Sequence, residues 1–393
     1  MFYLDKSFFD QVIDRRGTNS SKWDGLKNVY GTDDAIPMWV ADMDFRSPPE
    51  VVEAIKQRAQ HGMFGYTAVD DEYYSEVARW WQKRHGWDVQ PNWIVTSPGT
   101  ISALSVAVRT FTSAGDGIVI QPPVYPPFER TTRLAGRQVL CNQLLLDNGH
   151  YSMDFKGLDK LLSQGAKMFI FCSPHNPVGR VWTREELEEL ANVLSKYEDV
   201  VIFNDELWAD FVFPPHVHYP LLSVAPKLAK RTITATSVSK TFNLAGLENT
   251  NLFIPDEQLR KAFEEAMFAL ALSKTNLFAI VATKAAYKYG EPWLNILLQY
   301  LEENLQFIKT FLQQHLRTVG IVEPEGTYLA WMDIRQLGMS SAEVSQKLLH
   351  DGKVAVEEGT MFGPGGEGFL RANYAMPRAL LKQALEGMVK ALA

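Results

Sequence analysis

One lysine of this sequence follows a run of residues that is predicted to be a buried strand, and this position suits it to covalent chemistry. It ends the stretch Thr236-Ser-Val-Ser-Lys240, in which two small hydroxyl residues, Ser237 and Ser239, lie beside it. A partly buried lysine among small polar groups can be unprotonated part of the time, as a Schiff-base lysine requires. Lys240 is therefore predicted to bond to the aldehyde of a cofactor rather than to form a surface ion pair.

An aspartate at the end of a second buried strand complements the lysine. The run Val200-Val-Ile-Phe-Asn204 leads directly into Asp205, and open sheets place their ligand sites at the carboxyl ends of strands. A carboxylate beside a pyridine nitrogen favours the protonated ring. Lys240 and Asp205 together predict a pyridoxal phosphate site. The competing explanation for Asp205 is a residue that only caps a loop.

The phosphate of such a cofactor needs hydrogen-bond donors. Ser97-Pro-Gly99-Thr100 ends one predicted strand and opens an amphipathic helix. The free N–H groups and the helix dipole at Gly99 and Thr100 are predicted to hold the dianion, and Ser237 could add a hydroxyl. An ordinary helix cap would explain the same residues without any ligand.

Three other residues are candidates for contacts with the cofactor ring and the substrate. Asn176 lies in a proline-locked turn and could donate to the 3-oxygen of the ring. Tyr125 follows another strand and could stack on the ring. Arg371, on an alternating run, is predicted to clamp a substrate α-carboxylate with two parallel hydrogen bonds. A rigid turn for Asn176 and an exposed strand arginine for Arg371 are the alternatives.

The elements that position these residues alternate between short apolar strands and amphipathic helices from about residue 90 to 255. This order predicts an α/β fold with a large, mostly parallel seven-stranded sheet flanked by helices. The predicted strands are Trp93–Thr96, Ile118–Gln121, Gln138–Cys141, Met168–Cys172, Val200–Asn204, Thr232–Thr236 and Thr250–Ile254.

After these strands the sequence is predicted to be mostly helical. Beyond that helical region the apolar pattern indicates a mixture of strands and helices. Pro292–Arg317 carries leucines along one face and is predicted to be a long connecting helix. A smaller α+β domain is predicted beyond it. Its expected strands and helices are Thr327–Ile334, Phe369–Tyr374, Ser341–His350 and Arg378–Leu392. The predicted division is a large cofactor-binding domain at 46–290 and a small domain made of 1–45 and 291–393.

Composition limits the partners that this chain is expected to have. Its 393 residues are 46% hydrophobic and 22% charged, as is ordinary for a globular protein. The net charge of −7 argues against nucleic acid or an anionic membrane as a partner. The N-terminus lacks the layout of a signal peptide and no apolar run is long enough to span a bilayer, so a cytoplasmic location is expected. The two cysteines, Cys141 and Cys172, are expected to be reduced and buried, and no metal site is expected.

Six stretches spread along the chain are specific in combination. They are Arg16-Gly-Thr-Asn-Ser-Ser-Lys-Trp-Asp24, Met38-Trp-Val-Ala-Asp-Met-Asp-Phe45, Phe64-Gly-Tyr66, Pro123-Val-Tyr-Pro-Pro-Phe128, Asn176-Pro-Val-Gly-Arg-Val-Trp182 and Ser239-Lys-Thr-Phe-Asn-Leu-Ala-Gly246. With them the whole chain resembles the fold-type I pyridoxal phosphate enzymes of the aspartate aminotransferase superfamily. Within that superfamily it is most similar to the MalY/PatB-type carbon–sulfur lyases, which are cystathionine β-lyase-like enzymes.

The resemblance implies a role for each residue around the cofactor. Lys240 would be the Schiff-base lysine and proton shuttle, Asp205 would pair with the pyridine nitrogen, and Tyr125 would stack on the ring as the third member of the catalytic set. Asn176 would contact the 3-oxygen and border the substrate. The phosphate-binding residues implied are Gly99, Thr100 and Ser237.

The resemblance also implies how the substrate is held. Arg371 would clamp its carboxylate, and Trp39 and Ala41 would line the pocket entrance. Tyr66 would reach the phosphate and substrate region of the other subunit's site, which requires a homodimer with shared active sites.

Two positions depart from the family pattern. Trp208 stands where these lyases usually have histidine, and an indole N–H can donate but cannot titrate. Glu248 stands where the superfamily often has an arginine that touches the phosphate. Either Glu248 points away, or the helix N-terminus and hydroxyl groups alone balance the phosphate charge.

The function implied is β-elimination from cystathionine or a related S-substituted cysteine, which yields a thiol, pyruvate and ammonia. An aminotransferase acting on an amino acid and a 2-keto acid is the alternative, because the same residues serve both reactions up to Cα deprotonation. A regulatory pyridoxal phosphate-binding module is a remote third hypothesis. The family resemblance alone favours the lyase.

Overall fold

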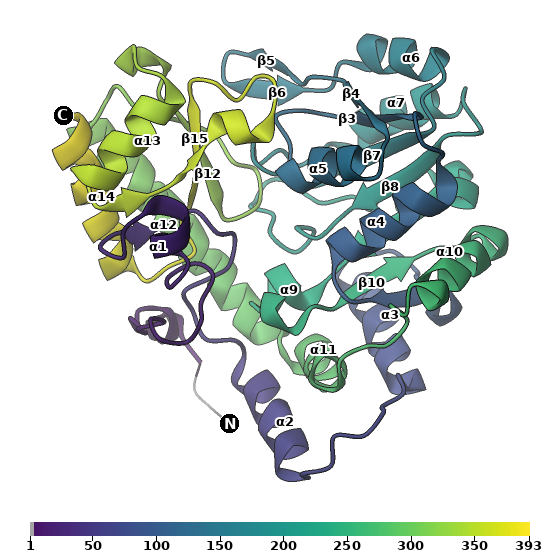
Figure 1. Cartoon of the computed structure of the whole chain (residues 1–393). Helices are drawn as coiled ribbons and strands as arrows, with labels where there is room; N and C mark the ends of the chain where they lie inside the picture. The colour runs from purple at the N-terminus through teal and green to yellow at the C-terminus, as the bar shows by residue number, and fades with distance from the viewer. Residues whose placement is uncertain (1–3) are drawn as a thin grey trace.

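The structure is a computed structural model, and it describes residues 4–393. The first three residues of the predicted 1–45 segment therefore lie outside the described residues. Figure 1 shows two parts side by side, one built on a large twisted sheet and one on a smaller sheet with helices packed against it.

The large sheet has seven strands in the order β2-β10-β9-β8-β7-β3-β4. β10 runs antiparallel to both of its neighbours, and every other pair is parallel. The predicted mostly parallel seven-stranded sheet is confirmed. The strands are β2 (Ile94–Ser97), β3 (Gly117–Ile120), β4 (Gln138–Cys141), β7 (Met168–Cys172), β8 (Val201–Asp205), β9 (Thr232–Thr236) and β10 (Thr250–Phe253).

Both faces of this sheet are covered, because its central strands are apolar on both sides. Every residue of β7 is buried. Phe169 and Phe171 face one hydrophobic core, and Ile170 between them faces a second core. The helices of this part are α3 (Asp71–His85), α4 (Thr100–Phe111), α5 (Pro126–Leu134), α6 (Phe155–Ser163), α7 (Arg184–Leu194), α8 (Leu221–Val224), α9 (Val238–Thr241), α10 (Glu257–Ala269) and α11 (Leu277–Tyr289). A hairpin of β5 (Leu145–Asp147) and β6 (His150–Ser152) follows β4.

The second part is built on a four-stranded antiparallel sheet in the order β11-β12-β15-β14. The long helix α12 (Glu291–His315) leads into it, as the leucine pattern predicts. Its strands and remaining helices are β11 (Gly320–Val322), β12 (Leu329–Asp333), β14 (Glu357–Glu358), β15 (Phe369–Asn373), α13 (Ser341–His350) and α14 (Arg378–Leu392).

The N-terminal segment packs on this second part. β1 (Ile36–Pro37) pairs in parallel with β13 (Val354–Ala355), and the short α1 (Leu26–Tyr30) precedes it. The buried amine of Lys22 donates to a carboxylate oxygen of Asp44 at 2.7 Å. α2 (Pro49–Gln60) then carries the chain to the lower end of the molecule (Figure 1).

Several predicted strand and helix bounds differ from the structure by one or two residues, and two expectations about individual residues differ as well. Asp205 is the last residue of β8 rather than the residue after it, because it is still paired with Ala235 of β9. Cys141 is exposed, so the expectation that both cysteines are buried is wrong for it. β4 is the edge strand of the sheet, and only one of its sides is covered by a neighbouring strand. Cys172 is buried as expected.

Within residues 4–393, no helix combines the length and the apolar character that crossing a lipid bilayer requires.

Candidate active site

A cavity of about 480 Å³ lies at the carboxyl ends of β7 and β8 and extends to β15 of the smaller sheet. Most of the predicted site residues line it, although they are up to 332 positions apart in the chain. Those it brings together are Trp39, Ala41, Gly99, Thr100, Tyr125, Asn176, Asp205, Lys240 and Arg371. Ser237 and Tyr66 are not among the lining residues.

Lys240 is presented by the single turn of helix α9. Ser237 caps that turn by accepting a hydrogen bond from the N–H of Ser239 at 3.0 Å. The amine of Lys240 donates to the carbonyl oxygen of Ala41 at 2.7 Å. Burial, together with the positive charge of Arg371, lowers the pKa of Lys240 to about 8. A substantial fraction of this amine is therefore neutral and nucleophilic near neutral pH.

Asp205 projects from the end of β8 into the same cavity and is buried. One of its carboxylate oxygens accepts the N–H of Leu207 at 3.1 Å. Burial raises the pKa of Asp205 to about 7, against the opposing effects of that hydrogen bond and of Lys240. A cationic N–H placed opposite would restore the ionised form, so the carboxylate suits a protonated ring nitrogen.

The start of α4 forms the end of the cavity where an anion fits. Gly99 has a φ of +90°, a conformation that glycine adopts without strain, and no side chain caps the helix that follows it. The hydroxyl of Thr100 shares a 2.8 Å hydrogen bond with the hydroxyl of Thr250. The Ser237 hydroxyl donates to the carbonyl of Asn249 at 2.5 Å, so its hydrogen is already used.

The two departures from the family pattern both border the cavity. Trp208 is buried, and the centre of its ring lies 5.6 Å from the Lys240 amine. Its ring also packs edge-on against Tyr328. Glu248 has a φ of +50° and an exposed side chain. Among the described residues that line the cavity, the only lysine and arginine are Lys240 and Arg371, so no cation of that wall offsets Glu248 at the anion end.

Arg371 is held by three groups. One of its terminal nitrogens donates to the side-chain oxygen of Asn176 at 3.0 Å, and the other donates to the carbonyl of Trp39 at 2.9 Å. The third partner is the carboxylate of Glu357, which also lines the cavity. Sequence reasoning missed Glu357, because two adjacent glutamates before Gly359 have the pattern of a solvated strand edge.

The two predicted tyrosines are placed differently. Tyr125 is half-buried at the start of α5, lines the cavity, and packs edge-on against Phe128. Tyr66 is fully exposed in the loop between α2 and α3. Since it does not line its own chain's cavity, any contact with an active site has to be made in another subunit.

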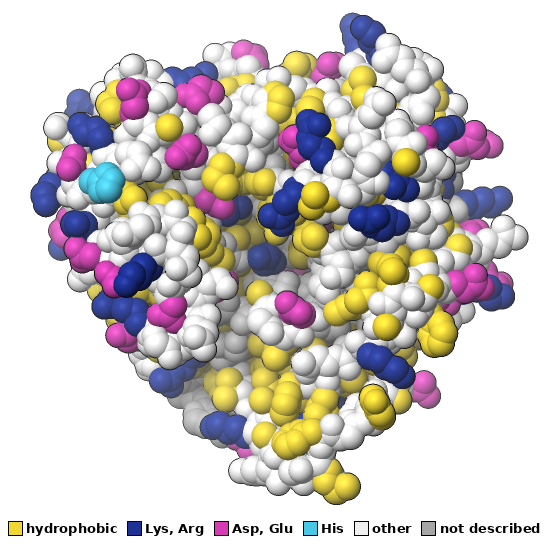
Figure 2. Space-filling view, viewed as in Figure 1, with side chains coloured by type: hydrophobic (Ala, Val, Ile, Leu, Met, Phe, Trp, Pro, Cys, Tyr) yellow, Lys and Arg dark blue, Asp and Glu magenta, His cyan; other side chains and the backbone are white. Residues whose placement is uncertain are grey.

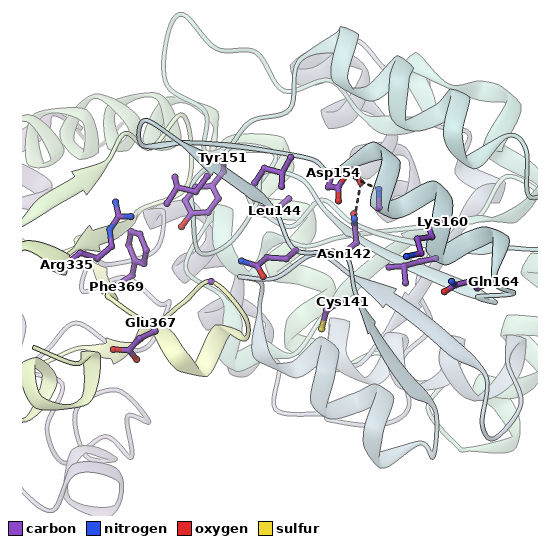
Figure 3. A pocket seen from close by; sticks show the side chains of 16 residues that line it. Cys141, Asn142, Leu144, Tyr151, Asp154, Lys160, Gln164, Arg335, Glu367 and Phe369 are labelled. Carbon is purple, nitrogen blue, oxygen red and sulfur yellow. Dashed lines mark hydrogen bonds between the residues drawn. The ribbon is translucent and has the colours of Figure 1, made fainter. Parts of the chain in front are cut away.

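A larger cavity, of about 840 Å³, lies elsewhere, between the β4–α6 region and the loop before β15 (Figure 3). Cys141 and Lys160 line it from one side, and Arg335 and Phe369 line it from the other. Arg335 is already paired with Asp333. Lys240, with its lowered pKa, and the buried carboxylate of Asp205 both lie in the smaller cavity, which is therefore the site with chemical capacity.

The residues of the smaller cavity fit pyridoxal phosphate. Lys240 supplies an amine of lowered pKa for its aldehyde, and Asp205 supplies a buried carboxylate for its ring nitrogen. The uncapped start of α4 at Gly99 supplies N–H groups for its phosphate. Tyr125 and Asn176 lie on the cavity wall, where they can contact the ring.

Comparison with known proteins gives a consistent picture. The family model for aminotransferase class I and II matches residues 34–388. Cystathionine β-lyase PatB of Bacillus subtilis (strain 168) is 43% identical over 385 residues, covering 98% of this chain and 99% of that protein.

Two solved structures extend this similarity to three dimensions. Cystalysin from Treponema denticola, which contains a pyridoxal 5'-phosphate cofactor, matches with a TM-score of 0.95 and 35% identity. The pyridoxal phosphate-bound C-S lyase from Staphylococcus hominis matches with a TM-score of 0.92 and 33% identity. Each match covers 98% of this chain and 98% of the other.

Proposed function

The chain belongs to the aminotransferase class I and II family and has the aspartate aminotransferase-like fold, and we propose that it is a pyridoxal phosphate-dependent carbon–sulfur β-lyase. Its substrate is cystathionine or a related S-substituted cysteine, and its products are a thiol, pyruvate and ammonia. The observation that carries the proposal is the convergence of Lys240, Asp205 and Arg371 on one cavity. The 43% identical relative is named a cystathionine β-lyase, which supports the substrate class.

When bound, pyridoxal phosphate supplies an electron sink for the electron pair left on Cα after deprotonation. Arg371 orients the substrate by its carboxylate. Lys240 would hold the cofactor by its aldehyde, and its amine, once free, would remove the Cα proton, a task for which a pKa of about 8 is well placed. Asp205 would supply the negative charge that keeps the ring nitrogen protonated. The buried rings of Trp208 and Tyr328 exclude water from one side of the lysine.

A single assay tests this function against its alternatives. Purified holoenzyme is incubated with cystathionine, with and without an added 2-keto acid, and pyruvate is measured. Pyruvate without added keto acid supports the lyase. Turnover that requires the keto acid would make the protein an aminotransferase. Tight cofactor binding without either reaction would favour a regulatory binding module.

We also propose that the protein is a homodimer with shared active sites. Hydrophobic side chains gather over the lower part of the molecule, where α2, α11 and the loop between α2 and α3 lie (Figure 2). The exposed hydrophobic residues of that loop and of the C-terminal end of α10 are Met63, Phe64, Tyr66, Phe268 and Leu270. Exposed apolar groups of this kind are typical of protein interfaces. Sedimentation equilibrium tests the dimer, and a monomer at micromolar concentration would contradict it.

The domain division and the location are part of the same proposal. The large domain spans 46–290, and the small domain combines 1–45 with 291–393, which the pairing of β1 with β13 supports. Limited proteolysis should cut first near these boundaries. A cytoplasmic location agrees with the unpaired thiols of Cys141 and Cys172, and fractionation of cells tests it.

A further inference from the structure

Glu357 and Arg371 lie directly opposite each other on adjacent strands. β14 pairs antiparallel with β15, and these two residues are register partners. Side chains at paired positions point to the same face of a sheet. Both side chains border the cavity of Lys240, with exposed fractions of only 15% for Glu357 and 4% for Arg371. The pair is thus a buried cation beside a half-buried anion on the wall of the active site.

This ion pair leaves hydrogen-bonding capacity unused. Among the described residues, the Nε of Arg371 has no hydrogen-bond partner, and Oε2 of Glu357 touches Arg371 without well-formed hydrogen-bond geometry. Burial raises the pKa of Glu357, while Arg371 and Lys240 act in the opposite direction. Both of these atoms are enclosed by the protein. The other carboxylate oxygen of Glu357 accepts no hydrogen bond from a described residue, so a ligand in the cavity can offer a donor to this oxygen and an acceptor to the guanidinium of Arg371.

An α-amino acid carries such a partner pair, because its carboxylate and its ammonium group are attached to the same carbon. We propose that Glu357 is a specificity-determining residue that, together with Arg371, makes the site select zwitterionic α-amino acids over carboxylates that lack an ammonium group. Arg371 takes the carboxylate and Glu357 accepts from the ammonium. This inference rests on the proposed function and deepens it.

The charge of Glu357 has the opposite effect on a 2-keto acid. Such a ligand brings a negative charge to Arg371 but no positive charge to Glu357, so two anions share a poorly solvated wall. Pyruvate, the product of the proposed elimination, is therefore expelled. A 2-keto acid that would serve as the second substrate of an aminotransferase is disfavoured for the same reason. Glu357 thus favours the lyase outcome.

Propionate and L-alanine form a matched pair of probes, because they differ only by the ammonium group and neither has a leaving group on Cβ. Their apparent affinities for the holoenzyme are measured by titration calorimetry, and each variant is compared with the wild type for the same probe, because the amine of L-alanine also condenses with the cofactor. Glu357→Gln preserves the size of the side chain and removes its charge. It should bind propionate about tenfold more tightly and L-alanine no more tightly than the wild type, since one charged contact is worth about a factor of ten.

Glu358→Gln is the control. Glu358 is the next residue of β14, opposite Leu370, and it does not line the cavity, so neither affinity should change. Glu357→Asp keeps the charge and should keep the preference for L-alanine. It serves as the second variant if Glu357→Gln does not fold.

Equal changes for both probes in Glu357→Gln would mean that Glu357 only positions Arg371, and this would overturn the proposal. Unchanged affinities would overturn it as well. The cystathionine assay on the wild-type enzyme tests the lyase function separately, so failure of one idea can be told from failure of the other.

Discussion

The amine of Lys240 and the hydroxyl of Tyr328 both donate to the carbonyl oxygen of Ala41, at 2.7 Å and 3.1 Å. Three distant segments therefore meet at one atom: the turn after β9, the residue before β12, and the N-terminal segment. If Lys240 leaves this carbonyl to hold the cofactor, as proposed, the bond from Tyr328 to Ala41 does not depend on it. The wall formed by the N-terminal segment can thus stay in place while the lysine changes partner.

Replacing Lys240 with alanine should abolish covalent retention of pyridoxal phosphate and lower kcat/KM by at least roughly 10²–10⁴-fold, since the general base is lost. Borohydride reduction followed by mass spectrometry of the intact protein measures the retention. The exposed Lys261, paired with Glu257, provides the control, and Lys261→Ala should keep both properties. Activity above a tenth of the wild-type value in Lys240→Ala would refute the assignment.

The rate at which the cofactor-free protein takes up pyridoxal phosphate should follow the neutral fraction of Lys240. With a pKa of about 8, this rate rises with pH and levels off above about pH 8. Arg371 is a cause of the lowered pKa, so Arg371→Leu should move the midpoint to higher pH. Asp205 acts in the opposite direction, so Asp205→Asn should move it to lower pH. Midpoints that do not move in either variant would contradict this electrostatic account.

Much of the fold is readable from the sequence, because caps and apolar runs define its elements. The predicted bounds of Met168–Cys172, Thr232–Thr236 and Ser341–His350 are those of the structure. The last of these is a helix that begins with a capping box formed by Ser340 and Glu343. Local signals of this kind need no knowledge of distant contacts.

The site was less predictable where its geometry depends on distant contacts. Ser237 has the residue type and position of a phosphate ligand, yet its hydroxyl donates to Asn249, twelve residues away. β14, which carries Glu357, has two residues and therefore no periodicity to detect. The place of Glu357 on the cavity wall becomes apparent only when β14 pairs with β15 and sets Glu357 opposite Arg371.

Tyr66 should act on the active site of the other subunit of a dimer, since it is exposed and absent from its own cavity. Tyr66→Ala and Lys240→Ala homodimers should each be nearly inactive. After subunit exchange, a mixed dimer has one site with both defects and one with neither. Half of the dimers in an equimolar mixture are mixed, so activity should return to about a quarter of the wild-type value at most. Proven exchange without any recovery would count against the shared site.

Glu248 should weaken the hold on the cofactor, because it places a negative charge on the cavity wall that is predicted to face the phosphate. Glu248→Gln should lower the dissociation constant of pyridoxal phosphate by about two- to fivefold at low salt and by less at high salt, where exposed charges are screened. Glu189→Gln, on the exposed side of α7, is the matched control. An unchanged constant at low salt would mean that the carboxylate of Glu248 points away from the phosphate.

Arg371→Leu should weaken binding of every amino acid substrate through its α-carboxylate and leave the cofactor spectrum unchanged. Charged hydrogen bonds are worth roughly 1.5–3 kcal/mol each, so kcat/KM should fall about ten- to a hundredfold or more. The loss should be similar for cystathionine and for a short S-alkyl cysteine, because both carry the same α-carboxylate. Asn176 and the carbonyl of Trp39 also hold the guanidinium. Arg371→Lys cannot keep both contacts and also grip a carboxylate with two hydrogen bonds, so it should recover little activity.

A defect of Arg371→Leu that is confined to cystathionine would place Arg371 at the far end of the substrate. That outcome would make it a determinant of the leaving group rather than the α-carboxylate clamp, and it would remove the basis for pairing it with Glu357 in amino acid recognition.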